Sequence, residues 1–363
     1  MNAGAEHLYA RFRDNFAGDT DIFLQKLDAF EQTLLAVDMR GGAAFQASFL
    51  DDRVLQYAPP TVWIPFAEAA ERVRRLPAPA HAPGFIFHVG HCGSTLVSRL
   101  IGACEGFSSL REPLALRQLT ELWQERAMPW SPVSVRRWHD WLELFLRSWS
   151  RGQEPGDHCI IKATSLSNLI APVLLAEDAN RRAISLSLSL EVYLPVMLAP
   201  NRAPMDLYLG ARNRLARHRA LVPELPWRLH DLSWGELAAV SWICERLSLA
   251  RLEHDFPEQV IPVDFDAFLA TPEASLCRIG EHFGRRLEPE AVQQALNTNI
   301  MRQYSKAPEH PYSPDIRRAV LAEARQTHAQ EIRKGLRLAE EAARHYGELG
   351  QLIEARSGLM ETA

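Results

Sequence analysis

The chain has 363 residues, a formal net charge of −5 at pH 7, and 47% hydrophobic against 23% charged residues. This composition is typical of a folded protein and excludes a disordered or fibrous chain. The 40 lysines and arginines form no block of like charge, so we expect no nucleic-acid partner. The 5 cysteines show no C-x-x-C spacing, which favours reduced thiols in a cytoplasmic protein without a structural metal.

The apolar stretches are too short for a membrane span. The longest, residues 169–176, falls far below the roughly 20 residues that a span needs. Residues 1–16 are polar and mixed in charge, unlike a signal peptide. We therefore expect no membrane partner, while the oligomeric state cannot be predicted from the sequence.

The first 80 residues are predicted to form a helical extension. Between residues 19 and 76, apolar side chains recur at the spacing of one helix face: Leu24, Leu27, Phe30, Leu34 and Leu35. Pro59-Pro60 interrupts this region. A segment rich in Pro and Ala, residues 77–83, then leads to the next part of the chain.

Residues 81–300 are predicted to form an α/β domain with a parallel sheet between two layers of helices. Short apolar runs at residues 84–89, 107–110, 159–161 and 183–188 each precede a helical pattern, as strands do in βα units. Later in the domain, an amphipathic helix is predicted at residues 235–252 and a further strand at residues 260–263.

Residues 301–363 are predicted to be a helical segment packed on this domain. Ser313-Pro314-Asp315 places a capping residue, a first-turn proline and an acid in succession, which indicates the start of a helix. We expect one long helix from there to Tyr346, ended by Gly347.

A loop with two glycines follows the first predicted strand, and we call it the glycine loop: Gly90, His91, Cys92, Gly93, Ser94 and Thr95. Backbone N–H groups at a helix N-terminus bind anions such as phosphate, and glycines permit close approach. The loop lacks the lysine that precedes Ser or Thr in nucleotide hydrolases, which argues against hydrolysis of ATP or GTP. We expect it to bind a nucleotide-type anion; the alternative is a turn without a ligand.

Polar residues follow the other predicted strands. Glu112 comes after the second strand, Lys162 ends the third, and Ser187 and Ser189 lie at the end of the fourth. In open parallel sheets, ligands bind beyond the carboxyl ends of the strands. We therefore expect these side chains near the glycine loop. For Glu112, an ion pair with Arg111 or Arg117 is the structural alternative.

The loop and these residues together resemble the PAPS-dependent sulfotransferases. Residues 90–96, including Leu96, fall in register with the 5′-phosphosulfate loop of that family. Glu112 comes 19 residues after Gly93, which is the spacing of the catalytic base in the tyrosylprotein branch. Lys162 matches a lysine that many members carry near the transferred group. Trp242 and residues 263–284 are similar to the family's Trp-bearing helix and closing segment.

The resemblance implies an α/β sulfotransferase fold and transfer of a sulfuryl group from PAPS, leaving PAP, to a hydroxyl-type acceptor. The acceptor would be a small molecule or a peptide. Glu112 would be the general base, Lys162 would stabilise the leaving group, and His91 would contact the phosphosulfate. The donor would be bound by the glycine loop with Leu96, Ser187 and Ser189, without a metal.

The chain departs from the family pattern at several positions. His91 stands where members have Arg or Lys, and Thr164 where cytosolic members carry a histidine base. Residues 181–189 place Leu or Ser where members have the arginine that reads the 3′-phosphate. The basic residues that would compensate are Arg202, Arg212, Arg214, Arg333 and Lys334.

Two alternatives follow from these departures. A sulfotransferase-like protein that has lost PAPS use, or that uses another donor, accounts for the missing arginine. A phosphatase would use Cys92 as nucleophile, but its loop arginine would have to be Arg99, one residue beyond the C-x₅-R position. That shift turns the side chain by about 100° around the helix.

Overall fold

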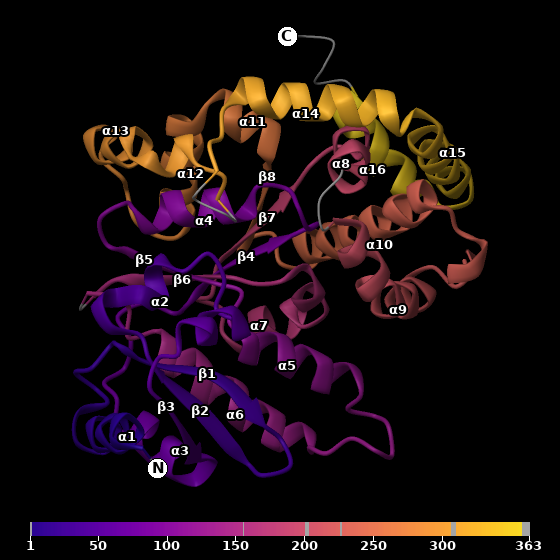
Figure 1. The fold of residues 1–363 in the computed structure, drawn as a ribbon. Coiled ribbons are helices and arrows are strands. Elements are labelled where there is room, and N and C mark those ends of the chain that lie inside the picture. The colour runs from indigo at the N-terminus through magenta and orange to yellow at the C-terminus, as the bar shows by residue number, and fades with distance from the viewer. Residues whose placement is uncertain (1, 155, 200–202, 226, 306–309, 358–363) are drawn as a thin grey trace.

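The computed structural model describes residues 2–154, 156–199, 203–225, 227–305 and 310–357. At its centre is a five-stranded sheet in the order β5-β6-β4-β7-β8, in which all neighbouring strands are parallel (Figure 1). Its strands are β4 (Gly84–His88), β5 (Phe107–Arg111), β6 (His158–Lys162), β7 (Ala183–Ser187) and β8 (Val260–Asp264). Every residue of β4 to β7 is buried. The predicted α/β class is confirmed.

Helices cover both sides of this sheet. Figure 1 shows α4 (Ser94–Gly102), α12 (Pro272–His282) and α13 (Pro289–Asn297) on one side. On the other side lie α5 (Leu114–Gln124), α6 (Val135–Trp149) and α7 (Ala171–Glu177). The long α10 (Trp234–Asp255) packs against β4, β7 and β8, and its capping box at Ser233 and Glu236 fixes where it begins.

The N-terminal region contains a second, antiparallel sheet, so the helical prediction for residues 19–76 is wrong over most of its length. Its strands are β1 (Ile22–Asp28), β2 (Thr33–Asp38) and β3 (Thr61–Pro65). The helices α1 (Ala3–Asn15) and α3 (Phe66–Arg74) contact β3, while α5 and α6 contact β1. Because both faces of β1 and β2 are covered, these two strands carry apolar runs rather than an alternating pattern, and runs are easily mistaken for helix.

Two arginines, Arg111 buried and Arg151 partly buried, join this N-terminal region to the rest of the chain. Arg151 donates hydrogen bonds to the carbonyl oxygens of Phe16, Asp19 and Ile22. Arg111, at the end of β5, donates to the carbonyls of Phe45 and Ala47. Burial lowers the pKa of Arg111 to about 9 and that of Arg151 to about 10. Main-chain carbonyls of the first 47 residues thus hold both guanidinium groups.

The C-terminal segment is helical, but it is not one long helix. It forms α14 (Pro314–Thr327), α15 (Ala329–His345) and α16 (Gly347–Ser357), and the first break lies at His328. Gly347 begins the last helix instead of ending a long one. The break lets α14 lie along α8 (Leu190–Leu198) while α15 packs on α10, where Gly335 meets Gly235 closely. Tertiary packing therefore decides where these helices end.

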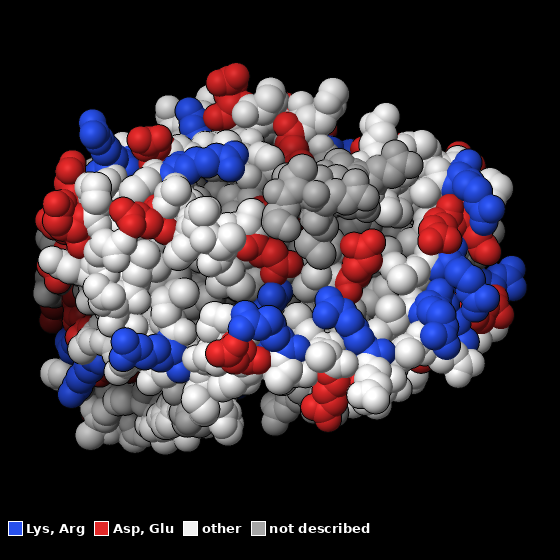
Figure 2. All heavy atoms as spheres, turned by 90° about the horizontal axis from the view of Figure 1, so that it is seen from above, with Lys and Arg blue, Asp and Glu red and all other residues white. Residues whose placement is uncertain are grey.

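The remaining elements are short or peripheral. They are η1 (Arg40–Gly42), α2 (Ala43–Gln46), η2 (Asp52–Tyr57), η3 (Ser165–Leu169), α9 (Ala203–Leu221), η4 (Leu229–Asp231), α11 (Phe265–Ala270) and η5 (Asn299–Arg302). On the face seen from above, acidic and basic side chains are interspersed (Figure 2). Among the helices of the described residues, none has the length and apolarity that crossing a membrane requires.

Candidate active site

The strand order places the glycine loop at the point where the direction of winding changes. Strand β4 lies in the centre of the sheet. The chain next adds β5 and β6 between β4 and one edge of the sheet, and then β7 and β8 between β4 and the other edge. Ligands of open α/β sheets bind at such a switch point, beyond the carboxyl ends of the strands. The glycine loop begins two residues after β4 and leads into α4. The predicted order of strand, loop and helix is confirmed.

The backbone of the loop is left-handed at Gly90 (φ 84°), His91 (φ 49°) and Gly93 (φ 76°). A side chain at position 93 would also collide with Phe265, because an added Cβ would lie 2.1 Å from its ring. Only glycine fits there. A non-glycine residue with positive φ costs about 1–3 kcal/mol, and such strain is concentrated at functional sites. The loop is thus held in an unfavourable conformation by its surroundings.

The start of α4 offers hydrogen-bond donors. The N–H of Leu96 donates to Gly93 O at 2.9 Å, whereas no hydrogen bond among the described residues uses the backbone N–H groups of Gly93, Ser94 or Thr95. Within the same described part of the chain, Thr95 Oγ1 is buried and has no partner, and the residue is 2% exposed. These groups can bind an anion, whereas the N–H of Leu96, which the resemblance includes in the donor site, is already engaged with Gly93.

His88, the last residue of β4, holds the glycine loop by a hydrogen bond. The sequence does not indicate this role of His88. Its Nδ1 accepts a hydrogen bond from the N–H of Gly90 at 2.9 Å, so its Nε2 carries the proton and donates to Ala163 O at 2.9 Å. These contacts tie the loop to the residue after Lys162. A histidine that ends a buried apolar strand gives no separate signal in the sequence.

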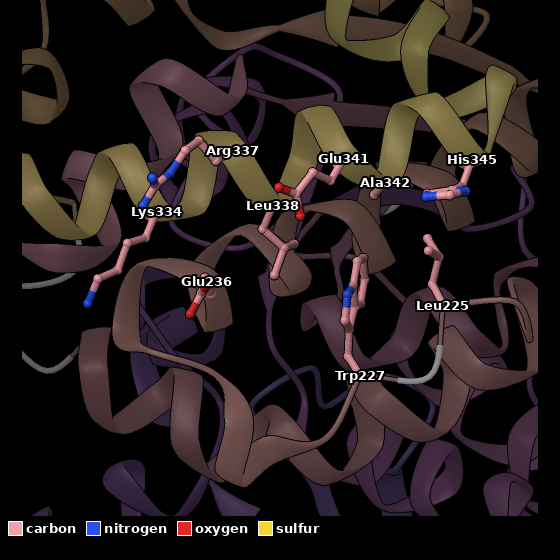
Figure 3. A pocket seen from close by; sticks show the side chains of 9 residues that line it. All are labelled: Leu225, Trp227, Glu236, Lys334, Arg337, Leu338, Glu341, Ala342 and His345. Atoms are coloured by element: carbon pink, nitrogen blue, oxygen red, sulfur yellow. The ribbon is translucent and has the colours of Figure 1, made fainter.

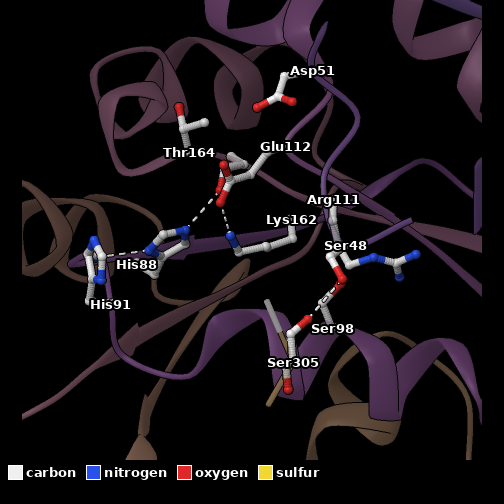
Figure 4. Close-up of polar contacts among 12 residues, drawn as sticks. Ser48, Asp51, His88, His91, Ser98, Arg111, Glu112, Lys162, Thr164 and Ser305 are labelled. Atoms are coloured by element: carbon white, nitrogen blue, oxygen red, sulfur yellow. Dashed lines mark hydrogen bonds and ion pairs between the residues drawn. The ribbon is translucent and has the colours of Figure 1, made fainter. Parts of the chain in front are cut away.

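Glu112 and Lys162 come together at the ends of neighbouring strands. Lys162 is 1% exposed, and its Nζ donates to Glu112 Oε1, while the Glu112 side chain remains 18% exposed (Figure 4). The N–H of Glu112 donates to Lys162 O at 2.7 Å, and its φ is 52°. The alternative ion pairs of Glu112 are not formed, because Arg111 binds carbonyls and Arg117 pairs with Glu121.

The pair adjoins the glycine loop. Strand β6, which ends at Lys162, lies beside β4, and Ala163 N donates to Ile86 O at 3.2 Å. A Cβ added to Gly90 would lie 3.6 Å from Ser165 Oγ, three residues after Lys162. In Figure 4, the side chains of Lys162 and Glu112 lie beside His88. Anion-binding donors, a cation and a carboxylate therefore share one edge of the sheet.

His91 and Cys92 have other contacts than those expected of them. His91 Nε2 lies 2.8 Å from Asp206 Oδ2 on α9, so its ring is engaged with that helix. Cys92 is buried, and its Sγ donates to Leu186 O at 3.5 Å. A phosphatase nucleophile must be an accessible thiolate. The position of Cys92 therefore argues against the phosphatase alternative.

Ser187 and Ser189 lie on the opposite side of β4 from the Glu112 and Lys162 pair. Ser187 is buried at the end of β7, and Ser189 precedes α8. The apolar side chains of α8 fill this region, and Trp242 Nε1 donates to Leu188 O at 2.9 Å. The described structure thus places apolar packing where the resemblance expects a 3′-phosphate contact.

The basic residues expected to replace the missing 3′-phosphate arginine are paired with acids, exposed on helices or outside the described residues. Arg214 Nε donates to Glu245 at 3.1 Å, and Lys334 Nζ to Glu331 at 2.7 Å. Arg212 and Arg333 are exposed on helices, and Arg202 lies outside the described residues.

A fully buried polar network lies behind the loop. Glu245 on α10 is 0% exposed and accepts hydrogen bonds from Arg217 at 2.7 Å, Arg214 at 3.1 Å and Asn168 Nδ2 at 2.9 Å. The same Asn168 amide donates to His88 O at 3.1 Å. The network is therefore linked to the loop through one asparagine.

A cavity of about 370 Å³ lies elsewhere in the molecule (Figure 3). Side chains of α15 and of residues 225–236 line it: Leu225, Trp227, Glu236, Lys334, Arg337, Leu338, Glu341, Ala342 and His345. Lys334 is the one residue of this lining that the sequence proposed as a phosphate contact. The cavity includes no residue of the glycine loop or of the strand ends.

No known family profile matches the sequence, and no curated protein does. Solved structures that are similar include mouse sulfotransferase SULT7A1 complexed with PAP, at 11% identity and a TM-score of 0.40, over 81% of this chain and 97% of that one. A sulfotransferase domain from the curacin biosynthetic pathway has 14% identity and a TM-score of 0.39, over 64% of this chain and 84% of that one. A sulfotransferase from Alicyclobacillus acidocaldarius has 12% identity and a TM-score of 0.37, over 75% of this chain and 94% of that one. Similarity at this level assigns no activity to this chain.

Proposed function

We propose that the chain is a sulfotransferase-like enzyme that moves a sulfuryl group from PAPS to a hydroxyl-type acceptor. The observation that carries the proposal is the convergence of Glu112 and Lys162 beside the glycine loop. A carboxylate that is partly exposed, next to donors for an anion, is the minimum that this transfer needs. The strained backbone at His91 and Glu112 supports a functional role for this edge.

The reaction divides between these residues. Glu112 accepts the proton of the acceptor hydroxyl as that oxygen attacks the sulfur atom. The bond between sulfur and the bridging oxygen breaks, and its electron pair goes to the phosphate of the departing PAP. The N–H groups of Gly93, Ser94 and Thr95 and the ammonium group of Lys162 stabilise the charge on that phosphate. The ammonium group of Lys162 donates to Glu112 in this structure, so it must also donate a hydrogen bond to PAPS when PAPS binds.

Isothermal titration of the full-length protein with PAP tests donor use. We expect saturable binding that is much tighter than that of 5′-AMP, because PAP carries a second phosphate. A transfer assay with PAPS and a panel of phenols, alcohols and tyrosine peptides then identifies the acceptor class. The proposal fails if PAP does not bind at millimolar concentration.

A second candidate is an anion-binding protein of this fold that does not use PAPS. The apolar packing of α8 at the end of β7 favours it, because no described residue there is a cation that could bind the 3′-phosphate in the way the resemblance expects. This candidate predicts binding of sulfate or phosphate at the glycine loop and equal affinity for PAP and 5′-AMP. The same titration therefore separates the two functions.

A further inference from the structure

Arg99 lies on α4, one helical turn after Thr95. Residues four apart on a helix are neighbours on one face. Side chains of a helix lean towards its N-terminus, so a long side chain at position 99 covers the turn that begins with the glycine loop. A side chain as long as that of Arg99 can therefore reach the end of α4 where the anion donors lie.

Both residues on this face have buried polar atoms without partners. Within the described residues, Arg99 Nη1 and Thr95 Oγ1 have no hydrogen bond and almost no contact with solvent. Desolvation by burial is the cause that lowers the pKa of Arg99. Arg99 as a whole is only partly buried, but a buried donor that lacks an acceptor costs free energy. The pair is thus incomplete in the unliganded protein.

The surroundings of Arg99 supply no counter-ion. Burial lowers the pKa of Arg111, and the positive charge of Arg99 lowers it further. Arg111 itself donates to the carbonyls of Phe45 and Ala47 rather than to an acid. Glu112 is already paired with Lys162. Two cations therefore stand near each other with no ion pair to either of them among the described side chains.

We propose that Arg99, together with Thr95 Oγ1, binds the tetrahedral oxyanion that the N–H groups of the glycine loop hold. Arg99 then takes the role that the sequence suggests for His91, whose ring is held by Asp206 on α9. For the phosphosulfate of PAPS this inference rests on the proposed function. For a simple sulfate or phosphate ion it stands without it.

The test compares four variants of the full-length protein. Arg99→Gln removes the charge, and Arg99→Lys keeps it without the planar donor pair. His91→Asn changes the residue that the sequence favours, and Arg136→Gln is a matched control at an exposed arginine of α6. Binding of PAP is measured by calorimetry, and binding of inorganic sulfate by the rise of the thermal unfolding midpoint.

We expect Arg99→Gln to weaken PAP and sulfate binding by about 10- to 150-fold, the effect of one charge-assisted hydrogen bond. Arg99→Lys should lose less affinity for PAP and sulfate than Arg99→Gln. Arg136→Gln should bind both ligands like the parent protein. Without a ligand, Arg99→Gln should unfold at the same temperature or higher, because it removes a partly buried cation whose Nη1 has no acceptor among the described residues. A purely structural arginine would instead lower that temperature.

Unchanged binding in Arg99→Gln overturns the inference, and so does a loss in His91→Asn as large as in Arg99→Gln. If the parent protein binds sulfate but not PAP, and Arg99→Gln weakens sulfate binding, the inference stands and the proposed donor does not. If the parent protein binds neither, both are rejected.

Discussion

Glu112 and Glu245 are both carboxylates held by buried cations, yet their surroundings differ. Glu245 is 0% exposed and accepts from two arginines and an asparagine on regular helices and an adjoining turn. Glu112 has one cationic partner, Lys162, is 18% exposed, and lies on backbone with positive φ. One carboxylate is fully engaged in the interior, and the other is open to an incoming molecule.

The difference separates a structural ion cluster from a candidate catalytic one. A buried carboxylate whose oxygens are all engaged cannot take a proton from a substrate, because no substrate atom reaches it. A strained and partly exposed carboxylate keeps that freedom at a cost in stability. Substitutions at the first should therefore change folding, and substitutions at the second should change turnover.

The largest expected effect is on turnover. Glu112→Gln should slow sulfuryl transfer by about 10²–10⁴-fold, because glutamine keeps the shape of the side chain and loses its basicity. Initial rates at saturating PAPS measure this, and PAP affinity should stay within a few-fold. Glu121→Gln, at an exposed glutamate of α5, is the control. Full activity in Glu112→Gln would remove Glu112 from the role of base.

The next effect is on folding. Glu245→Gln leaves Arg214 and Arg217 without a carboxylate in the interior, so the free energy of unfolding should fall by about 3–5 kcal/mol. Urea unfolding followed by circular dichroism measures it. If this variant folds normally and instead loses turnover selectively, the assignment of Glu245 to structure is wrong.

A substitution of Asn168 tests whether the Glu245 cluster supports the glycine loop, because the Asn168 amide donates both to Glu245 and to the His88 carbonyl. Asn168→Ala should lower the free energy of unfolding by about 1–3 kcal/mol, the cost of leaving buried acceptors unpaired. A smaller loss of PAP affinity should accompany it, since His88 also positions Gly90. Equal stability with unchanged affinity would show that the two regions are independent.

The smallest effect should come from His91→Asn. The pair of His91 with Asp206 is near the surface, and such pairs contribute about 0–1 kcal/mol. Asparagine also tolerates the left-handed backbone of this position. Unfolding and PAP binding should therefore change little. A large loss of PAP affinity would mean that His91 contacts the donor, and a large loss of stability would mean that its pair with Asp206 is structurally important.

The parallel sheet and the main site could be predicted because their signals are local. The apolar run before Gly90, the glycines and the helical pattern after them lie within a few residues of one another. The positions of Glu112 and Lys162 at strand ends could be predicted because each directly follows or ends an apolar run. Strand ends share an edge in any parallel sheet, so their convergence required no knowledge of the rest of the chain.

The remaining features depend on residues far apart in the sequence. His88 receives its role from Ala163, 75 residues away, and Asn168 from Glu245, 77 residues away. The sequence also cannot show that Arg99 Nη1 lacks an acceptor among the described residues, because that depends on segments far from position 99. The strands at residues 22–38 were missed because both of their faces are covered, which leaves no alternation to detect.

The arginines that bind main-chain carbonyls bear on how the molecule can be shortened. A fragment that begins at β4 would lose five carbonyl acceptors: those of Arg111 at Phe45 and Ala47, and those of Arg151 at Phe16, Asp19 and Ile22. Arg151 would keep only its hydrogen bond to Ser148 O, and the segment before Glu112 would lose its support. Trimming the first 80 residues to obtain a minimal catalytic unit would thus disturb the very strand end that carries the candidate base.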